Sequence, residues 1–357
     1  MRPSAILKYK IEQNSFDVIH LEVNEVSEKI LVSIVVPVFN QESTIRNNLE
    51  SLITNLGTSA ELILVNDCSS DGTDSEIHNF LAKSKSLSPN LRRISYYKFK
   101  HSLFETRSDH FGILKSSGSY IIEVQADMCI LEPNFDRKLV ATLENNPDLF
   151  MLSCRGIMTF REIFESFSKS KGNEVAINTN LFKSIANFLV INLRRWQSIK
   201  DSHEILTETG PIFPSLEEFS TSGNAGRLGR LIDQNSVSDV KNLYVGETVM
   251  RGPICFSKDR YMELGGFNVE AFFLGFDEHD LNLRARVLKN WKAGYTPISF
   301  ESPLKNGSMR KKRSLKTRLE ILVAIKRTNR HVPNSELFKV MESGGLSIEE
   351  YEIRTIS

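Results

Sequence analysis

The sequence contains only four cysteines, and none of them belongs to a C-x-x-C pair. Cys68, Cys129, Cys154 and Cys255 are scattered along the chain, which argues against a disulfide framework and against a cysteine zinc site. The chain also lacks a long apolar run. Its longest candidate, Ala186–Leu193, is far shorter than the roughly 20 residues that span a bilayer.

The sequence also has no large excess of positive or negative charge. The 45 lysines and arginines balance 44 aspartates and glutamates, so the formal net charge is only +1. We therefore expect no nucleic-acid partner, and any basic surface must be local. The first residues lack the apolar core of a signal peptide. The expected location is cytoplasmic, including the inner face of the membrane for a peripheral protein.

What the sequence does have is a regular alternation of strand and helix patterns between residues 31 and 155. Leu31–Val38 and Glu61–Val65 are nearly continuous apolar runs, typical of strands buried on both faces. A capping-box spacing at Thr73–Glu76 predicts the start of a helix. Further strands are expected at 93–99 and 120–124, and further helices at 43–55 and 104–114. This alternation predicts an α/β fold with a doubly wound, mostly parallel sheet.

The pattern divides the chain into five regions. Residues 1–30 form an N-terminal extension or edge strand, and 31–155 form the first α/β half. Residues 156–245 are a mostly helical, loop-rich insertion or lid. Order returns in 246–305, with a helix from Asp277 to Lys289. Residues 306–357 form a basic, helical C-terminal tail.

The tail is locally basic, because residues 310–330 hold nine basic residues against the single acid Glu320. Within it, four apolar residues share one helical face: Leu315, Leu319, Leu322 and Ile325. Clustered lysines and arginines near an anionic leaflet contribute roughly 1 kcal/mol each. We therefore expect either a peripheral contact with an anionic membrane or an acidic partner, or a solvated helix face packed on the domain.

Polar residues follow the first two strands directly, at Asn40–Glu42 and Asn66–Asp67. Ligands of open α/β sheets bind just beyond the carboxyl ends of the strands. Asp67 could accept hydrogen bonds from a base or ribose, or it could belong to a turn that caps the next helix. The coincidence of two such strand ends favours a ligand site.

Acidic residues at two further places are candidate metal-binding or catalytic residues. Asp127 follows the fourth strand and is either a turn residue or a ligand of Mg²⁺ or Mn²⁺, which bind carboxylate and phosphate oxygens. Asp277, Glu278 and Asp280 crowd the first turn of a helix, where acids also complement the helix dipole. Mutual repulsion there would raise at least one pKa, as a general base requires. His279 among them is interpreted as a structural partner.

Together these motifs resemble a family 2 glycosyltransferase of the GT-A fold over about 31–155 and 245–300. The resemblance rests on the ordered set Val32–Glu42, Asn66–Thr73, Arg107, Gly118, Gln125–Asp127, Gly265–Phe267 and Phe276–Arg284. It implies that residues 31–155 bind the nucleotide sugar and that 246–305 hold the acceptor and the catalytic acids. The implied nucleotide-sugar contacts are Pro37, Val38, Phe39, Asn40, Glu42, Asp67, Ser69, Arg107 and Ala126.

The resemblance also assigns the remaining site residues. Asp127 matches the last acid of the metal-binding Asp-x-Asp, so the implied cofactor is Mn²⁺ or Mg²⁺. Asp277 and Glu278 match the family's Glu-Asp pair, whose second member usually serves as the base. The acceptor-side or structural positions are Gly266, Phe267, Asp280 and Arg284.

Departures from the family pattern leave alternatives open. Gln125 stands where the first metal-motif aspartate is usual. Asp277-Glu278 inverts the usual order, so Glu278 is the base by position and Asp277 by residue type. No Gln-x-x-Arg-Trp follows, and without membrane helices a processive polysaccharide synthase is not expected.

The implied activity is that of an inverting, metal-assisted hexosyltransferase in polysaccharide biosynthesis. It would move a sugar from a nucleotide diphosphate sugar, expected to be a UDP-sugar, to a hydroxyl of a glycan or glycolipid. One alternative is a non-catalytic, glycosyltransferase-like subunit that binds nucleotide or glycan. A nucleotidyltransferase would need a Gly-rich phosphate loop after the first strand, where this chain has Asn40-Gln-Glu.

Overall fold

A computed structural model of the protein describes residues 16–24, 29–83, 88–161, 163–164, 242–301, 315–343 and 352–355. Most of the insertion expected at 156–245 lies outside these ranges. Within the described residues, no helix is both long and apolar enough to cross a membrane.

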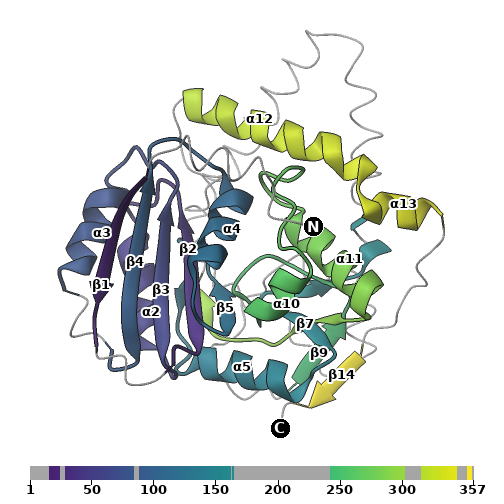
Figure 1. The fold of residues 1–357 in the computed structure, drawn as a ribbon, viewed down its shortest axis with the longest axis horizontal. Helices are drawn as coiled ribbons and strands as arrows, with labels where there is room; N and C mark the ends of the chain where they lie inside the picture. The colour runs from purple at the N-terminus through teal and green to yellow at the C-terminus, as the bar shows by residue number, and fades with distance from the viewer. Residues whose placement is uncertain are drawn as a thin grey trace, which may run out of the picture.

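One ten-stranded sheet runs through the molecule (Figure 1). In spatial order its strands are β1 (Phe16–Glu22), β4 (Leu91–Phe99), β3 (Ala60–Asn66), β2 (Val32–Val38), β5 (Tyr120–Glu123), β11 (Ile254–Ser257), β7 (Leu149–Ser153), β12 (Lys292–Tyr295), β9 (Asn242–Gly246) and β14 (Glu352–Thr355). Two short pairs flank it, β6 (Cys129–Ile130) with β13 (Phe300–Glu301) and β8 (Ile157–Met158) with β10 (Thr248–Val249).

The sheet is mixed, and most of its strands run in one direction. The pairings β4–β3, β3–β2 and β2–β5 are parallel, as the strand and helix alternation predicts. Three strands run the other way: β1, β11 and β9. The sequence pattern does not reveal that β11 enters between β5 and β7, because this pairing joins Ile254 to Glu123 and to Ser153 across long stretches of chain.

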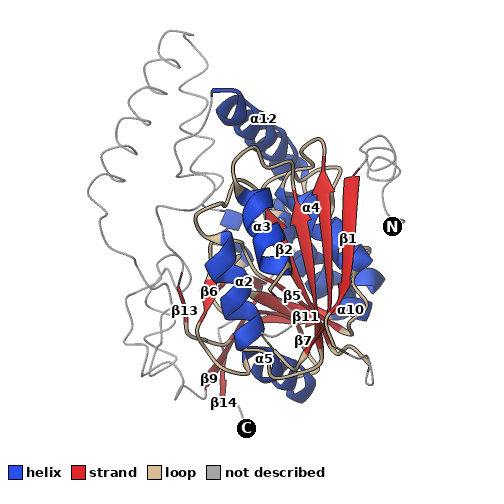
Figure 2. Cartoon of the chain, turned by 90° about the vertical axis from the view of Figure 1, so that its left-hand side faces the viewer, coloured by secondary structure: helices blue, strands red, loops and turns tan. Residues whose placement is uncertain are grey.

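Helices cover both faces of the sheet, which confirms the doubly wound α/β architecture (Figure 2). Alternate residues of β2 point to opposite faces, so Ile34 and Val36 join one core while Val35 joins the other. The first core is covered by α2 (Ile45–Thr54), α3 (Thr73–Leu81) and α5 (Phe135–Asn145). The second is covered by α4 (Glu105–Lys115), α10 (Lys258–Glu263) and α11 (Asp277–Lys289).

The helix start predicted at Thr73 is confirmed, but the capping box itself is not formed, because α3 has Gly72 at its N-cap and no side-chain cap hydrogen bond. The Thr73 hydroxyl donates to Asp71 and accepts from the Gln41 amide at 2.7 Å. Glu76 forms an ion pair with Arg46 at 3.0 Å instead of turning back to the helix start. The threonine therefore ties the helix to the end of β2.

The C-terminal tail contains the predicted helix, α12 (Leu315–His331), followed by a 3-10 turn (Val332–Asn334) and α13 (Glu336–Glu342). A third core joins Val332 and Phe338 to Phe272 and Phe276, which precede α11. The tail helices therefore pack beside the loop that leads into α11, and α12 crosses the top of the view in Figure 1.

Candidate active site

The turns after β2 and β3 are joined by hydrogen bonds at the carboxyl edge of the sheet. The Asn40 side chain accepts from the Ser70 amide at 2.8 Å, and the Asn40 amide donates to Ser69 Oγ at 2.9 Å. Glu42 Oε2 accepts from the Gly72 amide at 2.6 Å. The structure thus brings together three of the predicted nucleotide contacts, Asn40, Glu42 and Ser69. Pro37 and Val38 lie within β2, and Phe39 begins the turn.

Asp67 connects the end of β3 to the loop that precedes α4. Its carboxylate accepts hydrogen bonds from the amides of Leu103 and Phe104 and from Ser102 Oγ at 2.5, 2.9 and 2.6 Å. Burial nevertheless raises its pKa above the ordinary aspartate value. In this structure the Asp67 side chain therefore holds the 102–104 loop, and its contact with a base stays a prediction.

Arg107 lies on α4 and points toward the loop before α11. Its Nε donates to the Val269 carbonyl at 2.9 Å, and its guanidinium lies 3.9 Å from the centre of the Phe273 ring. Burial, followed by repulsion from Arg327, lowers the pKa of Arg107 to about 10. The side chain thus joins α4 to the loop that precedes Asp277 and Glu278, the predicted catalytic acids.

The metal motif follows β5. Ala126 and Asp127 are both buried, with 4% and 9% of their surfaces exposed. Gln125 Nε2 donates to Glu105 Oε1 at 3.2 Å. Among the described residues, no three His, Cys, Asp or Glu side chains are grouped to hold a metal ion. The described side chains therefore fit a divalent cation only as a single-carboxylate site at Asp127, completed by phosphate oxygens and water.

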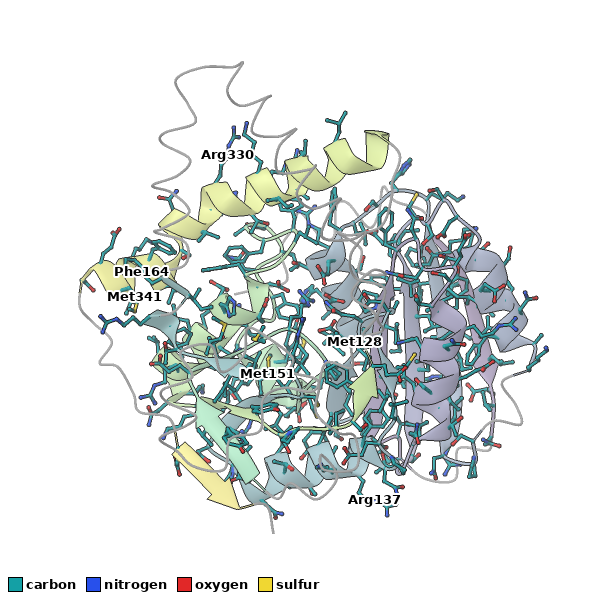
Figure 3. The ribbon with its side chains drawn as sticks, turned by 180° about the vertical axis from the view of Figure 1, so that it is seen from behind. Met128, Arg137, Met151, Phe164, Arg330 and Met341 are labelled. Carbon is teal, nitrogen blue, oxygen red and sulfur yellow. The ribbon has the colours of Figure 1, made fainter. Side chains whose placement is uncertain are left out.

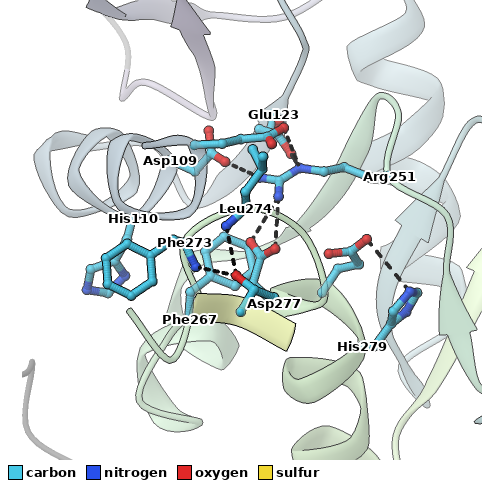
Figure 4. Close-up of polar contacts among 12 residues, drawn as sticks. Asp109, His110, Glu123, Arg251, Phe267, Phe273, Leu274, Asp277 and His279 are labelled. Atoms are coloured by element: carbon cyan, nitrogen blue, oxygen red, sulfur yellow. Dashed lines mark hydrogen bonds and ion pairs between the residues drawn. The ribbon is translucent and has the colours of Figure 1, made fainter. Parts of the chain in front are cut away.

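A buried arginine forms the centre of the site (Figure 4). Arg251, in the turn between β10 and β11, forms an ion pair with Asp109 of α4 and binds both oxygens of Asp277 at 3.0 Å. Glu123 of β5 and Glu105 of α4 lie 3.6 and 3.5 Å from its Nε. We call these five residues the Arg251 cluster. It joins β5, α4 and α11 through one guanidinium.

The Arg251 cluster holds more negative than positive groups, and this shifts its pKa values. Burial raises the pKa of Glu123 to about 8, although Arg251 attracts its charge. Burial raises the pKa of Asp277 to about 6, again against the attraction of Arg251. Glu123 therefore carries a proton at neutral pH, which relieves the repulsion within the cluster.

This proton makes the stability of the protein depend on pH. Glu123 has a folded-state pKa of about 8 and an unfolded value near 4.5, so the folded state binds the extra proton between these values. The stabilisation that comes from binding this proton is therefore lost as the pH rises toward 8. Glu123→Gln is expected to remove this loss, about 1.4 kcal/mol per pH unit in the free energy of unfolding.

Urea unfolding at a series of pH values between 6.5 and 8 checks this prediction. His110 and His279 are neutral in the folded state, because burial lowers their pKa values to about 4. In the unfolded state they are about half protonated at pH 6.5 and mostly neutral above pH 7, and the wild type and the variant share this contribution. Parallel pH profiles for the wild type and Glu123→Gln would show that Glu123 is already ionised in the folded protein.

The two adjacent acids of α11 have different surroundings. Asp277 is fully buried and both of its oxygens bind Arg251. Glu278 is 7% exposed, and its Oε2 accepts no hydrogen bond from any described residue. Its Oε1 lies 3.8 Å from His279 Nε2, and the pKa of His279 is lowered to about 4 by burial, so this neighbour is neutral. Glu278 Oε2 is buried, and Glu278 is thus the acid of the pair whose carboxylate is not bound to Arg251.

Asp280 and Arg284 hold the glycine turn between α10 and α11. Arg284 binds Asp280 at 2.9 Å and donates to the carbonyls of Leu264 and Gly266 at 2.6 and 2.7 Å. Gly266 has a φ of +70°, and a Cβ there would lie 2.8 Å from the His110 ring. Phe267, next in the chain, lies with its ring centre 6.0 Å from the Arg251 guanidinium. These four residues, which were predicted on the acceptor side, connect the glycine turn to α11.

Sequence reasoning missed Arg251, Asp109 and the role of Glu123. One signal was available: Glu123 and Arg251 interrupt apolar segments, and a charge in a buried segment requires a partner. Nothing in the spacing identifies the partner, because Asp109 and Arg251 are 142 residues apart.

The chain is similar in sequence to known glycosyltransferases. Residues 33–190 match the family model described as Glycosyl transferase family 2. The chain is 29% identical over 136 residues to "Uncharacterized glycosyltransferase YibD" of Escherichia coli (strain K12), covering 38% of this chain and 37% of that protein. It is 31% identical over 116 residues to an uncharacterized glycosyltransferase of Haemophilus influenzae, covering 32% of this chain and 33% of that protein. The match thus spans only about a third of the length of these two relatives.

Among solved structures, the mannosyltransferase PcManGT from Pyrobaculum calidifontis, in complex with GDP-Man and Mn²⁺, is similar in fold. The superposition has a TM-score of 0.47 at 11% sequence identity, and it covers 89% of this chain and 80% of that chain.

Proposed function

We propose that this chain, whose residues 33–190 match the model of glycosyl transferase family 2, transfers a sugar from a nucleotide-sugar donor to an acceptor hydroxyl. The observation that carries the proposal is the carboxylate of Glu278. It lies on a helix anchored by the Arg251 cluster and is 7% exposed, and among the described residues it is not bound by Arg251, whereas both oxygens of Asp277 are.

Glu278, rather than Asp277, is the proposed base. Both oxygens of Asp277 bind Arg251, so a proton acceptor there would have to break a buried ion pair. Glu278 can accept the proton of a hydroxyl that attacks the anomeric carbon. Because a carboxylate is a much weaker base than an alkoxide, the proton moves only as the new bond to the sugar forms. Attack from the face opposite the leaving group gives inversion.

The donor is proposed to lie at the carboxyl edge of the sheet, along the turns 37–42 and 66–73. A bound divalent cation, Mn²⁺ or Mg²⁺, would neutralise the charge of the leaving diphosphate. Asp127 is the side chain that would hold it. Asp67, Ser69 and Asn40 would orient the nucleotide, with a UDP-sugar as the expected donor and a glycan or glycolipid as the expected acceptor.

A thermal-shift experiment tests the donor site. A nucleotide sugar at 100 times its dissociation constant is expected to stabilise the folded protein by about 2.7 kcal/mol. Adding Mn²⁺ should increase this shift for the wild type and not for Asp127→Asn. The matched control is Asp259→Asn, an exposed carboxylate at the start of α10 to which no donor or metal role is assigned. Equal Mn²⁺ dependence in Asp127→Asn and wild type would contradict the role of Asp127.

A second function is supported by one observation. Gln125, at the first position of the metal motif, donates its amide to Glu105, and no described group of three ligands is present. A non-catalytic subunit that binds nucleotide or glycan would have such a motif. It would show nucleotide binding that Mn²⁺ does not change, together with no turnover of any nucleotide sugar.

A further inference from the structure

The outer face of α12 carries two exposed apolar side chains. Leu319 is 53% exposed and Val323 is 51% exposed. They are four residues apart, so they lie on the same side of the helix, one turn from each other. Of the predicted apolar face, Leu319 is exposed and Ile325 is half-buried, and the side chains of Leu315 and Leu322 lie outside the described residues. Among the described side chains of this helix, Ala324 and Thr328 are buried.

Basic side chains surround this apolar pair. Lys326, Arg327 and Arg330 are all exposed. At 100° per residue, they lie within about 60° of the direction midway between Leu319 and Val323. Figure 3 shows Arg330 projecting away from the body of the protein. Within the described part of the chain, neither Lys326 nor Arg330 forms an ion pair with a carboxylate.

The opposite side of α12 is attached to the loop before the catalytic acids. Thr328 Oγ1 accepts hydrogen bonds from the amides of Phe273 and Leu274 at 3.1 and 3.3 Å. The Arg327 guanidinium lies 5.3 Å from the centre of the Phe273 ring. One side of the helix thus fixes this loop, while the other side packs on nothing that the structure describes.

We propose that the outer face of α12, formed by Leu319, Val323, Lys326 and Arg330, binds the surface of an anionic lipid bilayer. Cations on such a face attract anionic headgroups, and apolar side chains between them enter the boundary of the acyl chains. An acidic protein would satisfy the cations and would have no need for two exposed apolar residues among them. The proposal is independent of sugar transfer. If both hold, the loop before Glu278 lies next to the membrane.

Sedimentation of the full chain with lipid vesicles tests this proposal. We expect binding to vesicles that contain phosphatidylglycerol, weaker binding at high salt, and little binding to pure phosphatidylcholine. Each cation near an anionic surface strengthens binding about fivefold, so Lys326→Glu with Arg330→Glu should weaken it at least about 25-fold. Leu319→Ser with Val323→Ser should weaken it as well.

A matched control uses the exposed apolar pair of α11. Val287 and Leu288 are 56% and 63% exposed, and the neighbouring Lys289 forms an ion pair with Glu263. Val287→Ser with Leu288→Ser should bind vesicles like the wild type, and unfolding curves would establish that all variants are folded. Failure of the wild type to bind anionic vesicles would overturn the proposal. Binding that depends on the cations and not on Leu319 and Val323 would also overturn it, in favour of an acidic partner.

Discussion

Glu278→Gln is expected to lower the turnover of the nucleotide sugar by about 10²- to 10⁴-fold, because the amide cannot accept the proton of the attacking hydroxyl. The folded state should be almost unaffected. Glu278 has no cationic partner among the described residues, and one of its oxygens accepts no hydrogen bond there. Release of nucleoside diphosphate measures turnover, and the KM for the donor should stay close to that of the wild type.

Asp277→Asn is the matched variant, since it makes the same chemical change one residue earlier. It should lower stability as well as activity, because it removes the charge that pairs with buried Arg251. Breaking a buried ion pair from one side typically costs about 3–5 kcal/mol. If a folded Asp277→Asn protein loses turnover while Glu278→Gln keeps it, Asp277 is the base and our assignment is wrong.

Arg251→Met is expected to destabilise the protein by about 3–5 kcal/mol. It would leave the buried carboxyl groups of Asp109, Glu123 and Asp277 without their cation. Urea unfolding measures the loss. The cost should shrink at low pH, since protonated carboxyl groups need no positive partner.

Two further variants serve as controls for the unfolding of Arg251→Met. Arg251→Lys keeps the charge and loses the planar, two-pronged geometry that binds both oxygens of Asp277, so it should recover only part of the stability. Lys339→Met removes an ion pair with Glu336 in which both side chains are more than 60% exposed, and it should cost less than about 1 kcal/mol. A cost for Arg251→Met as small as that for Lys339→Met would mean that the cluster does not hold α11 in place.

Most elements of the first half could be predicted from the sequence. The runs at Leu31–Val38 and Glu61–Val65 became β2 and β3 because a strand buried on both faces needs apolar residues at every position. The helix predicted at Asp277–Lys289 is α11 with the same bounds. Local patterns of this kind depend on neighbouring residues alone, so one sequence suffices to read them.

The strand order and the partners of the charged residues could not be predicted in this way. Arg251 meets Asp109 and Glu123 only because β11 is inserted antiparallel between β5 and β7. The exposed face of α12 is a similar case, since the helical pattern alone does not show that Leu319 is exposed while Ala324 and Thr328 are buried.

The sequence by itself determined the α/β class, the polar strand ends at Asn40 and Asp67, and the pair of acids at the start of α11. These features can be predicted from the sequence because each strand, turn or helix pattern depends on residues only a few positions apart. Only the tertiary structure distinguished Asp277 from Glu278. Both are acids in the first turn of one helix, and what separates them is Arg251, a buried charge that long-range strand pairing brings to Asp277 and not to Glu278.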